Sequence, residues 1–349
     1  MGNRGRLIAP GGLQDELPGG TGGETGDTPA EAAEPLAALA ARLGLRPTSE
    51  RPSLRSYLHK VWERRYFIVA YATARNVSMY TEARLGQLWQ VLTPLLNSAV
   101  YYLIFGILFK ANRGISNYTA YLVIGVFIFA FTERSIVVGS TVIRSNITLI
   151  RALHFPRACL PLAYVIVELQ QLLLSMIVLF AIVLGTGEPL TWYWLLLVPA
   201  LLMQAAFNMG AALIMARLGA GAQDISQLVP FLLRVWRYFC GVMYSIASLP
   251  AALPLWAKNV LSFNPAAVYI SLTRDAIMAT FRQDAPGAKP YDAARCAVFT
   301  ARKTPALQAY CHPDFGTGQL WLAGAGWAVV ILAAGVLFFW QAETRYGRG

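Results

Sequence analysis

The segment Pro161–Leu184 has the sequence PLAYVIVELQQLLLSMIVLFAIVL, and Glu168 is its only charged residue. An α-helix needs about 20 consecutive apolar residues to cross the roughly 30 Å hydrocarbon core of a bilayer. Five further segments of similar character occur along the chain: Leu92–Phe109, Tyr118–Ser140, Trp192–Ala216, Leu228–Ser248 and Leu320–Trp340. The sequence therefore predicts an all-α integral membrane protein with six transmembrane helices.

The composition of the whole chain agrees with this class. Of its 349 residues, 56% are hydrophobic and 13% are charged, whereas soluble domains are about 25% charged. The net charge of +11 comes from Lys and Arg residues that mostly flank the apolar segments, as in the cytoplasmic loops of membrane proteins. We therefore expect membrane lipid around the chain and no nucleic-acid partner.

Loop charges predict the orientation, because cytoplasmic loops carry the excess of Lys and Arg. The loop around 144–157, Arg217 and the C-terminal residues Arg345 and Arg348 are basic. Residues 1–50 are rich in Gly, Pro and acidic residues and lack the apolar run of a signal peptide. We expect them to form a disordered cytoplasmic tail. Both termini are then cytoplasmic, and the chain lies in the bacterial cytoplasmic (inner) membrane.

The same topology divides the rest of the chain. Residues 92–349 form the transmembrane domain, with an extracytoplasmic loop at about 249–319. The first part of this loop is apolar but broken by prolines, which favours two short re-entrant helices between spans five and six. Cys296 and Cys311 lie in its polar part and are expected to form a disulfide if the loop faces an oxidising compartment; two free thiols are the alternative.

Residues 51–91 have a different pattern, in which basic and aromatic side chains alternate. Lys60, Arg64 and Arg75 are interspersed with rings such as Trp62 and Tyr66. This pattern predicts an amphipathic helix in the membrane interface. A soluble helix packed on a partner protein is the alternative.

No catalytic constellation is recognisable. The chain contains no phosphate-binding G-x-x-x-x-G-K-[ST] loop, no H-E-x-x-H and no G-x-S-x-G. The three histidines, His59, His154 and His312, are far apart in the predicted topology. We therefore expect neither a catalytic residue nor a metal or cofactor site in this chain.

Two stretches stand out instead. Residues Ala74–Leu96 have the sequence ARNVSMYTEARLGQLWQVLTPLL, and residues Asn146–Leu162 have the sequence NITLIRALHFPRACLPL. In the second stretch, Pro156 and Pro161 end a short amphipathic helix and begin a new span, since proline is tolerated in the first turn of a helix. Its apolar residues Leu149 and Ile150 would suit a groove on a partner protein.

Both stretches resemble the permease subunit of the ABC-2-type polysaccharide exporters, which export O-antigen, teichoic acid or galactan. The first keeps the family's Arg75, Tyr80, Leu85, Gly86, Trp89 and Pro94, and the second keeps Asn146, Leu149, Ile150, Phe155, Pro156, Arg157, Leu160 and Pro161. Asn76 and Met79 depart from the family pattern, which usually has Asp and a basic residue there. YSIASLP followed by NPAAVYISLTRDAI is a third match, so the resemblance covers residues 57–281 and the last span.

The resemblance implies a homodimer of permeases with two nucleotide-binding ATPase subunits, which bind the ATP and Mg. An undecaprenyl-type lipid-linked polysaccharide, with cell-wall galactan as the first choice, would pass between the permeases. The coupling helix to the ATPase would comprise Asn146, Leu149, Ile150, Phe155, Pro156 and Arg157. A small-molecule (drug) ABC-2 exporter and a membrane-bound glycosyltransferase or polymerase of the same polymer are the alternatives.

The substrate path needs cations for a pyrophosphate head and weakly binding walls for sugars. We expect the cations to be Arg75, Arg84, Arg234 and Arg237, and the rings to include Tyr101, Phe127, Phe131 and Tyr238. The alternative for the arginines is structural pairing with Glu133 or Glu168, because an unpaired charge inside a membrane is costly. The alternative for the rings is ordinary packing.

Overall fold

The computed structural model describes residues 53–79, 84–86, 88–108, 117–152, 155–244, 246, 254–278 and 317–343. These residues all belong to one compact unit, 51–349. The predicted tail and the predicted disulfide between Cys296 and Cys311 lie outside the described residues.

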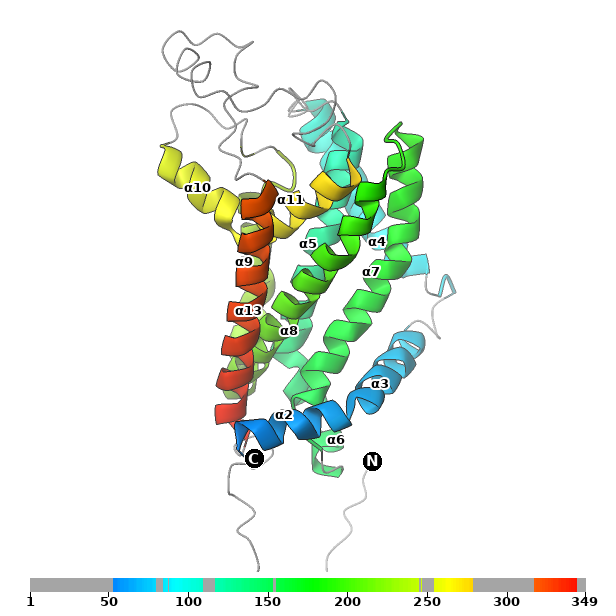
Figure 1. The fold of residues 1–349 in the computed structure, drawn as a ribbon. Helices are drawn as coiled ribbons and strands as arrows, with labels where there is room; N and C mark the ends of the chain where they lie inside the picture. Colours follow the sequence, from blue (N-terminus) through cyan, green and yellow to red (C-terminus); the bar gives the residue numbers. More distant parts are fainter. Residues whose placement is uncertain are drawn as a thin grey trace, which may run out of the picture. The chain divides into compact units, whose positions relative to one another are not determined.

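All the regular secondary structure in the described part of the chain is helical (Figure 1). Five of its segments are long and apolar enough to cross a membrane: Leu88–Leu108, Tyr118–Ser145, Cys159–Gly185, Trp192–Gly221 and Gly318–Gln341. They correspond to predicted spans one to four and six. The chain is therefore a multi-pass membrane protein.

The five segments contain helices α4 (Leu88–Tyr101), α5 (Tyr118–Ser145), α7 (Cys159–Gly185), α8 (Leu197–Gly221) and α13 (Thr317–Gln341). A π-helical stretch, Tyr102–Leu108, continues α4, and a 3₁₀ turn, Trp192–Leu196, precedes α8. Among these five segments α5 is the most deeply buried, since 72% of the residues in its apolar window are buried within the chain.

Small residues allow α8 to lie close to both α5 and α13. A methyl group added at Gly335 of α13 would lie 2.3 Å from the carbonyl oxygen of Gly210 in α8. One added at Gly219 of α8 would lie 1.8 Å from the carbonyl oxygen of Ser140 in α5. Such contacts are typical of membrane helices, which gain stability from close packing because lipid is as apolar as their side chains.

The predicted fifth span, Leu228–Ser248, differs from the helix found there. Helix α9 runs from Gln223 to Phe239 and has 17 residues. The chain then turns at Cys240 and Gly241, where Gly241 has a φ of +63°. Helix α9 therefore begins earlier than predicted. It also ends earlier, because the positive φ at Gly241 does not allow the helix to continue.

The expectation of a single amphipathic helix over 51–91 is wrong. Helix α2 (Leu54–Glu63) and helix α3 (Arg65–Ser78) meet at Arg64, and α4 already begins at Leu88. The two short helices pack on different surfaces: Tyr57 of α2 contacts the end of α13 through Glu343, whereas Ile68 and Ala72 of α3 pack beside α7. The bend at Arg64 lets both contacts form.

Helices α10 (Leu255–Phe263) and α11 (Pro265–Ile277) are short and are separated by Asn264. The Asn264 side chain accepts a hydrogen bond from the Ala266 N–H and so caps α11, with Pro265 in the first turn. Helix α11 packs near the start of α5 and of α13, while α2 and α6 (Ile147–Ala152) lie at the other end of these helices (Figure 1).

Candidate functional site

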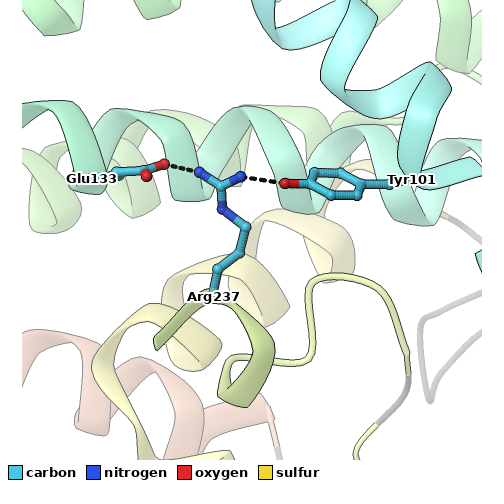
Figure 2. A network of polar contacts seen from close by, with 3 residues as sticks. All are labelled: Tyr101, Glu133 and Arg237. Atoms are coloured by element: carbon cyan, nitrogen blue, oxygen red, sulfur yellow. Dashed lines mark hydrogen bonds and ion pairs between the residues drawn. The ribbon is translucent and has the colours of Figure 1, made fainter. Parts of the chain in front are cut away.

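A polar network connects three helices within the apolar part of the chain (Figure 2). The guanidinium of Arg237, from α9, forms an ion pair with the carboxylate of Glu133 in α5. Its other terminal nitrogen donates a hydrogen bond to the hydroxyl of Tyr101 at the end of α4. The Arg237 and Glu133 side chains are only 14% and 22% exposed, so both charged groups are largely enclosed by the protein.

Aromatic rings surround the Arg237 cation. Its guanidinium carbon lies 5.3 Å from the centre of the Phe129 ring and 5.8 Å from that of Tyr101, distances at which a ring face attracts a cation. Trp236 packs edge-on against Phe129 and donates its indole N–H to Asn264 at 3.0 Å. The network therefore fixes the polar side of α9 against α4, α5 and the start of α11.

The sequence left open whether Arg237 pairs with Glu133 or Glu168. In the structure its partner is Glu133. Glu168 is buried, and its Oε2 has no hydrogen-bond partner in the described part of the chain. Arg134, the nearest described cation, instead donates to Gln171 at 3.3 Å. Arg237 was predicted to line the substrate path. In this conformation its charge is neutralised by Glu133.

Arg234 differs from Arg237 although it lies one helical turn away. Its side chain is exposed, and no ion pair or hydrogen bond to it occurs within the residues that the structure describes. Tyr238, also predicted for the path, is 48% exposed on the same helix. Arg234 and Tyr238 are therefore the predicted path residues that α9 presents on its surface.

The other predicted path residues are separated from this surface. Phe127 and Phe131 are buried in the core of α5 and border a small cavity of about 10 Å³, together with Arg134 and Glu168. Arg75 on α3 and Arg84 in the following turn are exposed. The structure thus groups Tyr101 with Arg237, Phe127 with Phe131, and Arg234 with Tyr238, but does not join these groups into one path.

The predicted coupling segment begins with a hydrogen-bonded junction at Asn146. The Asn146 amide donates to the carbonyl of Val142 at 2.8 Å and so ends α5. Its Oδ1 accepts a hydrogen bond of 3.2 Å from the hydroxyl of Tyr71 in α3, and its amide contacts the Tyr164 hydroxyl of α7. Burial raises the pKa of Tyr71 to about 12, so this hydroxyl keeps its proton at neutral pH.

The short helix that follows is α6 (Ile147–Ala152), as the prolines predict. The expectation that Leu149 and Ile150 form an exposed apolar face is wrong for Ile150, which is 8% exposed and packs in the chain's own core. Leu149 is half-buried, while Thr148 and Arg151 are exposed. Ile150 instead belongs to a buried cluster with residues of α5, α7, α8 and α13.

The segment ends in the turn Phe155–Pro156–Arg157. The Phe155 ring lies 5.4 Å from that of Phe67 in α3. The backbone N–H of Arg157 donates to the carboxylate of Glu343, which follows α13. The coupling residues are therefore held by α3 at both ends of the segment and by the end of α13.

Sequence reasoning missed Arg274 of α11, although it is a charged residue inside an apolar segment. Its guanidinium is buried and donates to the carbonyls of Tyr121, Gly241 and Val242 at 2.9–3.1 Å. It also lies over the Tyr121 ring. Arg274 thus holds the turn after α9 against the start of α5, and its charge within YISLTRDAI was the available signal.

Long apolar helices, an ion pair largely enclosed between them and a short helix at one end of the bundle define a multi-pass membrane protein. The chain belongs to the ABC-2 type transporter family, whose model matches residues 67–278. The family resemblance inferred from the two sequence stretches is confirmed. Membership identifies the chain as a permease, the membrane subunit of an ABC transporter, and not as an enzyme.

Related proteins carry a consistent name. The chain is 29% identical over 201 residues to the "O-antigen export system permease protein RfbA" of Klebsiella pneumoniae, covering 57% of this chain and 75% of that protein. It is 23% identical over 192 residues to the protein of the same name from Myxococcus xanthus, covering 55% and 73%. A second Klebsiella pneumoniae protein of that name is 27% identical over 201 residues, covering 57% and 75%.

Proposed function

We propose that this permease moves an undecaprenyl-type lipid-linked polysaccharide across the bacterial cytoplasmic membrane, with cell-wall galactan as the specific cargo. The observation that carries the proposal is the family match together with relatives named as O-antigen export permeases. The match spans the helices that hold the Tyr101–Glu133–Arg237 network and the segment 146–157.

The proposed topology has six membrane segments, with α9 as the short fifth one, and both termini in the cytoplasm. Helices α10 and α11 have nine and 13 residues, too few to cross about 30 Å. They are proposed to re-enter the outer leaflet, where backbone breaks are tolerated if protein covers them. Cys296 and Cys311 are proposed to pair in the outer loop.

The proposed assembly is a homodimer with two nucleotide-binding ATPase subunits, which bind the ATP and Mg. Segment 146–157 is proposed as the coupling helix to these subunits. Thr148 is exposed and Leu149 is half-exposed on α6, so these two side chains are available to a partner. Ile150 supports α6 from within.

The proposed path runs along the surface of α9. Exposed Arg234 is the cation available to a pyrophosphate head, which suits a guanidinium fork. Arg237 has its charge neutralised by Glu133. Opening of the path would then require this ion pair to separate or to move as a unit.

The test of the proposal is partner dependence. The purified chain should hydrolyse no ATP alone, because it has no phosphate-binding loop. Addition of its nucleotide-binding partner subunit should produce ATP hydrolysis, and a partner subunit with its phosphate-binding lysine replaced should not. ATP turnover by the chain alone would contradict the proposal.

A further inference from the structure

The carboxylate of Glu343 joins three segments that are far apart in the sequence. Its Oε2 accepts a hydrogen bond of 2.9 Å from the hydroxyl of Tyr57 in α2. Its Oε1 accepts one of 2.9 Å from the backbone N–H of Arg157. The guanidinium of Arg157 also donates to the backbone carbonyl of Glu343. Both carboxylate oxygens and the main chain of one residue are thus used to hold the end of segment 146–157.

Tyr57 shows how much α2 depends on this contact. It is the one residue of this ten-residue helix that is fully buried, and it is 3% exposed. The neighbouring side chains Arg55, Ser56 and Leu58 are exposed. The attachment of α2 to the bundle therefore passes through the Tyr57 ring, its hydrogen bond to Glu343 and the packing of the half-buried Val61.

The other end of segment 146–157 is held by the adjoining helix α3. The Tyr71 hydroxyl donates to Asn146, and the Phe67 ring packs on Phe155. Helices α2 and α3 together therefore contact the segment at its first residue, at its turn and, through Glu343, at its last residue. A displacement of the segment cannot occur without moving α2, α3 or the end of α13.

We propose that Glu343 is the positioning residue of segment 146–157: it fixes the Arg157 end to α2 and α13, so that these elements move with the segment as one unit. The functional part of this inference, transmission of the ATPase movement, rests on the proposed coupling role of the segment. The positional part rests on the contacts alone.

Hydrogen–deuterium exchange of the full-length chain in lipid nanodiscs tests the positional part. Pro156 has no amide N–H, so exchange across residues 155–158 reports mainly on Arg157 and Ala158. Glu343→Ala should increase the exchange rate of the Arg157 amide about tenfold or more, the factor expected for the loss of a hydrogen bond to a charged group. Glu343→Asp, which keeps the charge, should give an intermediate rate.

Glu63→Ala is the matched control, because Glu63 is an exposed carboxylate at the end of α2. It should leave the Arg157 amide at the wild-type rate. An unchanged rate in Glu343→Ala would overturn the proposal. Faster exchange throughout α5 and α13 would also overturn it, since Glu343 would then support the whole fold and not the position of the segment.

A second measurement separates this inference from the proposed function. In the assembled transporter, Glu343→Ala should lower the amount of polysaccharide exported per ATP hydrolysed, while the ATPase rate persists and Glu343→Asp restores part of the ratio. If the Arg157 amide is released but the ratio stays at the wild-type value, Glu343 positions the segment and the coupling role of the segment is wrong. If neither changes, the positioning role itself is wrong.

Discussion

At the residue scale, Arg234 and Arg237 show how two similar side chains take different roles. Both lie on α9 one turn apart, yet Arg237 is enclosed with Glu133 and Tyr101, while Arg234 is exposed. A charge inside an apolar region is tolerated when it is paired and hydrogen-bonded. Arg237 therefore contributes to the packing of α9, and Arg234 is left free for an anionic ligand.

Replacing the two arginines should separate these roles. Arg237→Ala leaves the Glu133 carboxylate without its partner, and breaking a buried pair costs about 3 kcal/mol. We expect a clearly lower Tm for Arg237→Ala in detergent, with partial recovery in the double variant Arg237→Met with Glu133→Gln. Arg234→Ala should keep the wild-type Tm and accumulate normally but export less polysaccharide. Equal Tm values for the two alanine variants would contradict the assignment.

Glu343 leads to a prediction about pH. Burial raises the pKa of its carboxyl above the ordinary value of 4.5, and the N–H of Arg157, the Tyr57 hydroxyl and the Arg157 charge reduce this rise. Cys159 is a further titratable group close to Glu343. A carboxyl whose pKa is raised in the folded state stabilises the fold fully below about pH 4.5, and this contribution is lost as the pH rises through the folded-state pKa.

The glutamine side chain in the Glu343→Gln variant cannot ionise, so this variant does not lose stability as the pH rises through the folded-state pKa of Glu343. The difference in Tm, variant minus wild type, should increase as the pH is raised from 4.5 upwards. A difference for Glu343→Gln that falls with pH would show that the sign is wrong.

At the element scale, the contact between α8 and α13 depends on glycine. A side chain at Gly335 would overlap the backbone of Gly210 at 2.3 Å, whereas a methyl group at Gly326, on the same helix, would meet nothing within 4 Å. Gly335→Ala should therefore lower the free energy of unfolding by about 1–3 kcal/mol. Gly326→Ala should be neutral or slightly stabilising, because alanine favours helix. Similar Tm values for both variants would disprove this packing.

The short helix α6 carries the coupling prediction. Leu149→Asp places a charge on the half-exposed apolar position that a partner groove would cover, so ATP hydrolysis should continue while export falls. Thr141→Asp, on an exposed position of α5, is the control and should leave both activities unchanged. The measurement is polysaccharide at the cell surface together with the ATPase rate of the purified complex. Normal export by Leu149→Asp at normal expression would reject the coupling role.

Element positions were largely predictable from sequence, while their ends and contacts were not. Hydropathy located five spans because a membrane demands apolar length, and Pro161 located the start of α7 to within two residues. The bend at Arg64 and the turn after α9, whose carbonyls at Gly241 and Val242 are bound by Arg274, depend on tertiary contacts. The partner of Arg237 lies 104 residues away in the chain, so no local pattern could identify it.

At the scale of the whole molecule, the two ends of the helix bundle differ in chemistry. At one end lie α2, α3 and α6, with hydrogen bonds that join Tyr57 and Arg157 to Glu343. At the other end lie α10 and α11, with the hydrogen bonds from Arg274 to backbone carbonyls. Between them, the Tyr101–Glu133–Arg237 network connects α9 to the bundle. ATP-driven movement at the first end would thus reach the path beside α9 through α5, which continues into segment 146–157.

The central claim, ATP-driven export of a lipid-linked polysaccharide, is tested most directly in inside-out membrane vesicles that contain the chain and its nucleotide-binding subunit. Lipid-linked polysaccharide labelled in its sugars is supplied on the outer, originally cytoplasmic, face, and its protection from an added glycosidase is followed. The account predicts that ATP makes the polymer protected with the wild-type chain and not when the ATPase subunit is inactive. Protection that is independent of ATP, or equal in vesicles without the chain, would contradict it.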